Sequence, residues 1–168
     1  IRIGPLDPAM VGERLLFSAF HVLRGQELWA SDGTLAGTAM VKDIRSGFQG
    51  SFPSGHVLHD GALYFAADDG ESGFELWKSD ATAAGTRRVA DIRAGREGSM
   101  PTALTVWRDR LVFVADDGAS GFQIWETRGD AASTRRLGPA NGMRAAPFDT
   151  SGRTDGGAGP FDTSGRAE

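Results

Sequence analysis

The sequence of 168 residues contains no cysteine, no long apolar run and no excess of basic residues. The absence of cysteine excludes disulfides and thiolate chemistry. No apolar run approaches the roughly 20 residues that a membrane-spanning helix needs, so we expect no membrane span. The net charge is −4 and charges of both signs are interspersed, which leaves no basic stripe to follow a phosphate backbone. We therefore expect no nucleic-acid partner.

Turn-forming residues are abundant instead. The chain has 24 glycines, and no window keeps apolar residues at helical spacing over the length of a helix. This composition is typical of an all-β protein with many tight turns. Because the chain begins at Ile1, without an initiator methionine or a signal peptide, we expect a processed form or part of a longer protein.

Three tryptophans, Trp29, Trp77 and Trp125, recur at intervals of 48 residues, and their surroundings recur with them. The segments at 26–32, 74–80 and 122–127 share one register, as do the apolar triplets at 15–17, 63–65 and 111–113. A repeat of about 40–50 residues is the length of one four-stranded propeller blade. The sequence therefore predicts β-propeller blades in three four-stranded antiparallel repeats of 48 residues.

The middle repeat predicts strands at 55–59, 62–67, 74–79 and 86–92, with a hairpin turn at Asp60 and Gly61, where both positions must tolerate positive φ. The third repeat predicts strands at 104–107, 110–115, 122–127 and 134–137. The first predicts strands at 10–11 and 14–19 and has an altered second turn at 20–25. The blades cover about 5–52, 53–100 and 101–140 in a domain of residues 1–141.

Three blades do not close a ring, because propellers typically use about four to eight. We expect either self-association, in which two three-bladed chains complete six blades, or a ring completed by repeats that this chain lacks. An open stack is the third alternative.

The last segment, residues 142–168, has a different composition. The sequence PFDTSGR occurs at 147–153 and again at 160–166, within a stretch rich in Gly, Ser, Thr and Pro. Such a composition is typical of a flexible tail or linker. The alternative is that each copy of the motif docks on a partner, for example by adding a strand to a neighbouring blade.

Residues 27–34 read ELWASDGT and residues 75–82 read ELWKSDAT, and both continue into an apolar-x-Asp-Ile step followed by Gly, Ser and Pro at matching positions. Over roughly residues 5–140 the chain resembles the bacterial ELWxxDGT repeat family. The third unit departs from the pattern, with TRGD at 127–130 and GPA at 138–140. The resemblance implies a propeller-like repeat in secreted or surface-exposed bacterial proteins, hence an extracellular or cell-surface location. It implies no catalytic residues.

Paired aspartates occupy matching turns of the second and third units: Asp68, Asp69, Asp116 and Asp117. Carboxylates together with backbone carbonyls are ligands that Ca²⁺ takes, so these turns are a candidate metal site. The alternative is that aspartate and the following glycine serve turn geometry alone. No other cofactor is indicated.

The remaining candidate residues are Asp32, Asp80 and the three tryptophans. We expect Asp32 and Asp80 to hold turns by side-chain-to-backbone hydrogen bonds, with ligand binding as the alternative. We expect Trp29, Trp77 and Trp125 to be core wedges between adjacent blades. The alternative is that they are aromatic platforms on which sugar rings stack.

These observations favour a non-catalytic, secreted or surface-attached binding module, whose most concrete version is a lectin-like role with a glycan partner. The second hypothesis is a structural repeat whose open ends pair with other chains. The third is a propeller enzyme, although no acid–base pair or nucleophile context stands out.

Overall fold

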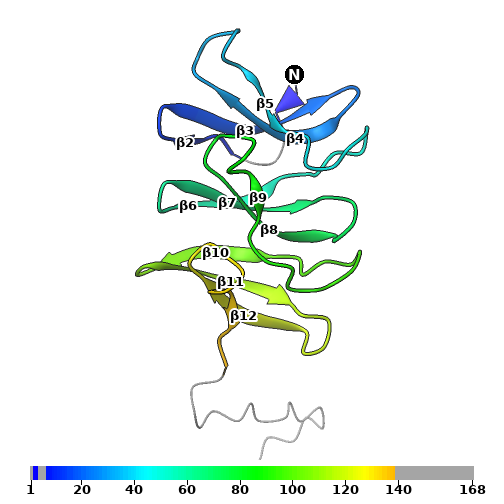
Figure 1. The fold of residues 1–168 in the computed structure, drawn as a ribbon, viewed down its shortest axis with the longest axis vertical. Helices are drawn as coiled ribbons and strands as arrows, with labels where there is room; N and C mark the ends of the chain where they lie inside the picture. Colours follow the sequence, from blue (N-terminus) through cyan, green and yellow to red (C-terminus); the bar gives the residue numbers. More distant parts are fainter. Residues whose placement is uncertain (1, 4–6, 139–168) are drawn as a thin grey trace, which may run out of the picture. The chain divides into compact units, whose positions relative to one another are not determined.

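The computed structural model describes residues 2–3 and 7–138, and these residues form three antiparallel β-sheets (Figure 1). No helix occurs within them, and so none that could cross a membrane. The expected all-β class and its repeated sheets are confirmed. The expected tail, 142–168, lies outside the described residues.

The first sheet has five strands: β1 (Arg2–Ile3), β2 (Ala9–Val11), β3 (Arg14–His21), β4 (Gly25–Ser31) and β5 (Ala39–Lys42). The second sheet has four: β6 (Ser54–His59), β7 (Ala62–Asp68), β8 (Phe74–Ser79) and β9 (Arg87–Arg88). The third also has four: β10 (Thr102–Trp107), β11 (Arg110–Asp116), β12 (Phe122–Thr127) and β13 (Arg135–Arg136).

The four-stranded meander predicted for each repeat is present in the second and third sheets, which run in chain order from β6 to β9 and from β10 to β13. The first sheet contains an additional strand, since both β1 and β2 pair with β3. A boundary at residue 5 missed β1, because a strand of two residues is too short to show a period.

The 48-residue repeat is also a repeat of strand register. Phe17 lies opposite Trp29, Phe65 opposite Trp77, and Phe113 opposite Trp125, each across the central hairpin of its sheet. The predicted turn between β6 and β7 is confirmed as well, with φ of 47° at Asp60 and 72° at Gly61.

The predicted last strands are too long. Residues 86–92 were expected to be extended, but β9 includes only Arg87–Arg88, and β13 only Arg135–Arg136. In the second sheet Val89 still donates to the carbonyl of Leu76, at 2.8 Å. Beyond it, the backbone N–H groups of Ile92 and Arg93 turn to a side chain, the carboxylate of Glu75. The chain therefore leaves the sheet where its backbone N–H groups donate to a buried carboxylate instead of to a neighbouring strand.

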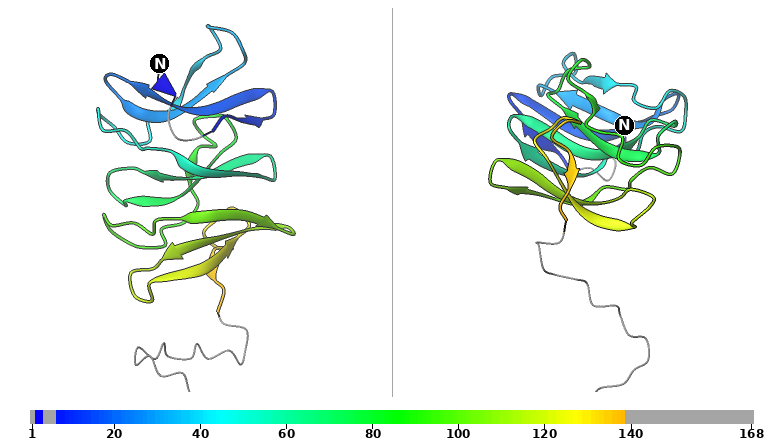
Figure 2. Two further views of the ribbon diagram at one scale, coloured as in Figure 1. Left: turned by 180° about the vertical axis from the view of Figure 1, so that it is seen from behind. Right: turned by 60° about the horizontal axis from the view of Figure 1, so that its bottom comes forward.

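The sheets stack face to face in chain order, as both views of Figure 2 show. We call the face that carries Leu63, Phe65 and Ala67, which packs on the first sheet, the N-side face of the second sheet. The opposite, C-side face carries Tyr64, Leu76 and Val89 and packs on the third sheet. The same names apply to the residues 48 positions earlier and later in the sequence.

Two apolar clusters fill the two junctions. Between the first and second sheets, the C-side residues Leu16 and Leu28 meet the N-side residues Leu63 and Phe65, all with 0% exposure. Between the second and third sheets, the corresponding residues are Tyr64, Leu76, Leu111 and Phe113. Strands buried on both faces explain why residues 63–67 form an uninterrupted apolar run. Within the described residues the stack has two ends and does not close into a ring (Figure 1).

Candidate functional site

Two of the four aspartates named as a candidate calcium site accept hydrogen bonds from the backbone of their own turns. Asp69 Oδ1 accepts from the N–H groups two and three residues further on, at 2.9 and 2.7 Å. Asp117 Oδ1 accepts from the equivalent pair at 2.9 and 2.6 Å. The backbone donors of Ser120 and Ala119 hold the pKa of the Asp117 carboxyl below its usual value. The predicted turn chemistry is therefore present in both repeats.

The neighbouring aspartates connect successive sheets. Asp116 forms an ion pair of 2.7 Å with Arg93, which lies in the segment leaving the second sheet. Asp68 pairs with Arg45, which leaves the first sheet in the same way. Arg45 and Arg93 are 48 positions apart, so an equivalent ion pair connects the sheets at each of the two junctions.

Calcium binding at the four aspartates stays a prediction. Among the residues that the structure describes, no three acidic or histidine side chains gather as a metal site would require. The carboxylate oxygens that a cation would use face N–H and guanidinium donors here.

Asp32 and Asp80 are exposed and hold equivalent turns, as expected. Asp32 Oδ1 accepts from the N–H of Thr34 at 2.9 Å, and Asp80 Oδ1 accepts from the N–H of Thr82 at the same distance. The hydroxyl of each threonine donates to the same oxygen, and this bond is the largest cause of the lowered pKa of both carboxyls. A ligand role for these aspartates stays a prediction.

The three tryptophans occupy equivalent positions in different surroundings. Trp77 is 7% exposed in the cluster between the first and second sheets, so its ring offers little surface to a sugar. Trp125 packs against the second cluster and donates from Nε1 to the carbonyl of Ala115 at 3.2 Å. The predicted wedge position is confirmed for these two. Trp29 is on the N-side face of the first sheet, which no other sheet of the described residues covers, so it is not a wedge between sheets of the described part of the chain.

Two buried glutamates were missed at the sequence level. Glu75 has 0% exposure, and its carboxylate accepts hydrogen bonds from the N–H groups of Ile92, Arg93 and Ser99 and from the Ser99 hydroxyl. Burial raises the pKa of Glu75 above its usual value, against the lowering effect of these donors. The carboxylate fastens the connecting loop to the sheet, and so it fixes where the next sheet begins.

Glu27 repeats this arrangement with Ile44, Arg45 and Ser51. Burial likewise raises its pKa. The signal that could have revealed both sites is a glutamate followed 24 positions later by a serine, in two repeats. The third repeat has Gln123 at this position, and that side chain donates to the carbonyl of Ser120 instead.

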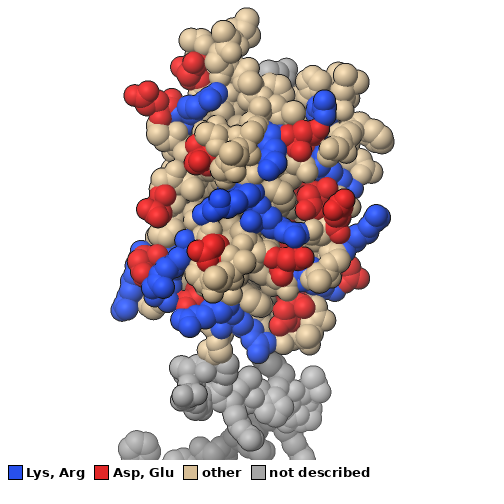
Figure 3. Space-filling model, in the orientation of Figure 1, with Lys and Arg blue, Asp and Glu red and all other residues tan. Residues whose placement is uncertain are grey.

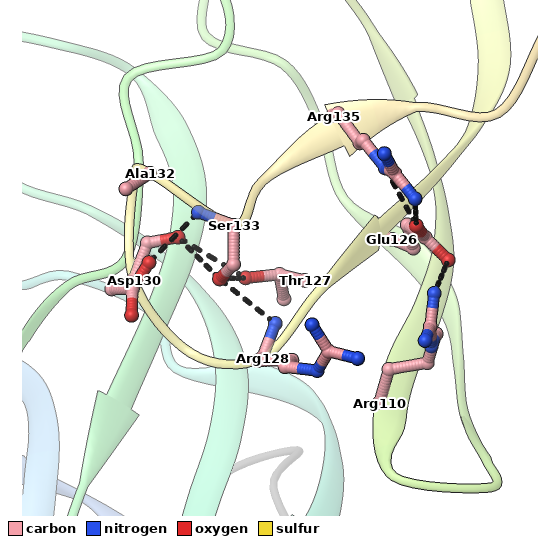
Figure 4. A pocket seen from close by; sticks show the side chains of 8 residues that line it. All are labelled: Arg110, Glu126, Thr127, Arg128, Asp130, Ala132, Ser133 and Arg135. Atoms are coloured by element: carbon pink, nitrogen blue, oxygen red, sulfur yellow. Dashed lines mark hydrogen bonds and ion pairs between the residues drawn. The ribbon is translucent and has the colours of Figure 1, made fainter.

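A polar pocket of about 440 Å³ lies in the third sheet and its last turn (Figure 4). Glu126 is its most buried carboxylate and forms ion pairs with Arg110 at 2.7 Å and Arg135 at 2.6 Å. The bond from Arg110 is the largest cause of the lowered pKa of Glu126, so this carboxyl stays ionised and paired. Asp130 and Ser133, which lie on the other side of the pocket, hold the turn through the Ser133 N–H at 2.8 Å.

The most unusual surfaces are the two ends of the stack. On the N-side face of the first sheet, Leu15, Phe17 and Trp29 are partly exposed. Their counterparts in the second sheet, Leu63 and Phe65, are 0% exposed because the first sheet covers them.

The C-side face of the third sheet shows the same contrast. Ile124 is 51% exposed, whereas Leu28 and Leu76 at the equivalent positions are 0% exposed. A groove of about 450 Å³ runs over this face, and apolar side chains such as Val112, Ile124 and Leu137 line it. Trp107, which also lines the groove, is 50% exposed.

Charges of both signs are interspersed on the face of the molecule drawn in Figure 3, where lysine and arginine side chains are mixed with those of aspartate and glutamate.

Comparison with known proteins gives no family. No family model and no curated protein matches this sequence. Among solved structures, the computationally designed Ika8 protein is similar with a TM-score of 0.41 and 18% identity over 80% of this chain. A puromycin hydrolase S511A mutant complexed with PGG is similar with a TM-score of 0.40 and 16% identity over 84% of this chain. The alignments cover 36% and 29% of those two chains, respectively. The resemblance to ELWxxDGT repeats stays a prediction.

Proposed function

We propose that this chain is a non-catalytic assembly module of the β-propeller type, which acts by packing its two open sheet faces against further sheets. One observation carries the proposal. Repeat positions whose side chains are fully buried at the two internal junctions carry partly or half exposed side chains at the two ends. Ile124, for example, is 51% exposed, whereas the equivalent Leu28 and Leu76 are 0% exposed. Exposed apolar patches of this kind mark interaction surfaces.

The free energy available at such a face is large. At about 25 cal/mol per Å², covering roughly 300 Å² of apolar surface contributes about 7.5 kcal/mol, before the costs of association are subtracted. Hydrophobic burial thus favours a covered face over one left in water.

The closed form of the proposed assembly is a ring. Propellers use about four to eight blades, so two chains of three sheets would supply six. The alternative is a ring completed by repeats on a longer chain. Both follow from the same open faces.

The test is the mass of the full chain, measured by light scattering over a hundredfold range of concentration. We expect a dimer or a larger species whose fraction rises with concentration. A strictly monomeric chain at every concentration would contradict the proposed function.

The polar pocket favours a second candidate, a lectin-like role in a secreted or surface-attached protein. Its hydroxyl, carboxylate and guanidinium groups, from Ser133, Asp130 and Arg128, supply both donors and acceptors for a ligand rich in hydroxyls. Titration with a panel of neutral and acidic oligosaccharides, read by isothermal calorimetry, tests this role. Loss of any observed binding in Ser133→Ala would assign it to the pocket, and no binding at millimolar concentrations would rule it out.

A further inference from the structure

The two internal junctions are copies of each other. At the first, Leu63, Phe65 and Ala67 pack on the face of Leu16 and Leu28. At the second, Leu111, Phe113 and Ala115 pack on the face of Tyr64 and Leu76. Each junction therefore joins the C-side face of one sheet to the N-side face of the next, with all positions advanced by 48 residues.

The two ends of the stack supply one copy of each face. The first sheet leaves its N-side face open, with Leu15 and Phe17 in the places of Leu63 and Phe65. The C-side face of the third sheet is likewise open among the described residues, with Ile124 in the place of Leu76. The open faces are thus of opposite kind, and they correspond to the two halves of a junction that the chain already makes twice.

We propose that the C-side face of the third sheet in one copy of this chain packs on the N-side face of the first sheet in a second copy, head to tail. This inference rests on the proposed assembly function and names its partner and orientation. The interface is heterologous, so repeating it produces a ring if the rotation closes and a filament if it does not.

Side-chain size supports a head-to-tail contact over a contact between identical faces. The N-side face of the first sheet presents the aromatic rings of Phe17 and Trp29. The C-side face of the third sheet presents a groove whose lining includes the branched side chains of Val112, Val114 and Ile124 beside the ring of Trp107. Large side chains pack well against smaller ones, as Phe65 does against Leu16 and Leu28 at the first internal junction.

The polar fastenings of the internal junctions are not repeated at the ends. Position 20, equivalent to Asp68 and Asp116, is a phenylalanine that is 48% exposed. In the sequence, the position equivalent to Arg45 and Arg93 is Asn141. A junction between two copies is therefore held by apolar contact, without the ion pair that accompanies a covalent connection.

The test uses two full-length variants, each with one face blocked by a charge. Trp29→Lys blocks the N-side face, and Ile124→Lys blocks the C-side face. Leu35→Lys is the matched control, because Leu35 is 94% exposed in a turn outside both faces. Leu15→Lys is a second N-side variant, in case the Trp29 change affects folding, which circular dichroism reports. Sedimentation velocity of each variant alone and of equimolar mixtures gives the masses.

We expect each blocked variant alone to be monomeric, with association weakened at least about thirtyfold, since a central contact residue contributes about 2 kcal/mol or more. Mixing the two variants leaves one intact N-side face and one intact C-side face. We expect this mixture to form a 1:1 dimer that grows no further, while Leu35→Lys assembles as the unchanged chain does.

Two results would overturn the inference in distinguishable ways. If the unchanged chain never associates, the proposed function fails together with the inference. A C-side face occupied by residues 142–168 of the same chain would give this result. If the chain associates but one blocked variant alone still dimerises, assembly holds and the head-to-tail orientation is wrong, since identical faces then meet.

Discussion

At the scale of single residues, the buried glutamates explain more of the architecture than the tryptophans that mark the repeat. Glu75 accepts hydrogen bonds from three backbone N–H groups and one hydroxyl, all from the loop that leads to the third sheet. A carboxylate has enough lone pairs to accept from all four donors, whereas the NH₂ group of an amide would point two hydrogens at these donors. The residue therefore decides whether the loop can close.

We predict that Glu75→Gln lowers the free energy of unfolding by about 2–4 kcal/mol, because it leaves buried donors unpaired. Urea unfolding monitored by tryptophan fluorescence measures the change. Gln123→Glu is the control at the equivalent, partly exposed position of the third repeat, and we expect a change below about 0.5 kcal/mol. Equal effects at the two positions would show that the hydrogen bonds from the loop to Glu75 are not the cause of the destabilisation.

The comparison of the unchanged chain with Glu75→Gln also predicts how their difference in stability depends on pH. Burial raises the pKa of Glu75 above its ordinary value of 4.5, so the folded protein binds this proton at higher pH than the unfolded chain does. The stabilisation from protonation is present below pH 4.5 and is lost as the pH rises through the folded-state pKa. The difference in stability between the unchanged chain and Glu75→Gln should therefore grow as the pH falls from 7 towards 4.5. A difference that shrinks would mean that the four donors outweigh burial.

At the scale of elements, the connecting loops depend on close backbone approaches. Gly98 has a φ of +66°, and a Cβ there would lie 2.4 Å from the backbone nitrogen of Phe74. Gly95, in the same loop, has a φ of +97° and no atom within 4 Å of a Cβ position. Both glycines recur in the previous repeat, so sequence alone does not separate their roles.

We predict that Gly98→Ala lowers the free energy of unfolding by about 3 kcal/mol or more, because backbone atoms cannot move aside as a flexible side chain would. Gly95→Ala should cost only about 1 kcal/mol, from its positive φ alone. Thermal unfolding of both variants provides the comparison. Similar losses at the two sites would indicate that φ, and not the contact with Phe74, sets the cost.

At the scale of the whole molecule, the two open sheet faces are the features that determine how the chain associates in our proposal. Since the proposed junction is apolar and lacks the Arg93–Asp116 type of ion pair, salt should affect it little. We predict that the dissociation constant of the assembly changes less than about threefold between roughly 0.05 and 1 M NaCl. Sedimentation equilibrium across this range measures it. A much larger loss of affinity in 1 M salt would point to charged contacts between copies.

Most of the fold could be predicted from the sequence because the repeat is regular. The period set by Trp29, Trp77 and Trp125 placed the central hairpins of all three sheets within one or two residues. Strand β1 and the short lengths of β9 and β13 could not be predicted. All three depend on which backbone groups pair across a sheet, and β9 also on the N–H groups that turn to Glu75, and neither is a local property of the sequence.

The sequence by itself determined the kind of element, the register of the repeat and the turn chemistry of Asp69, Asp80 and Asp117, because these depend on residues near one another in the chain. Only the tertiary structure decided which tryptophan is buried. Trp29 and Trp77 have nearly the same neighbours in sequence, yet among the described residues only Trp77, of these two, has a preceding sheet packed against its face. Burial is a property of what stacks on a surface, and similar repeats at the end and in the middle of a stack differ in what covers them.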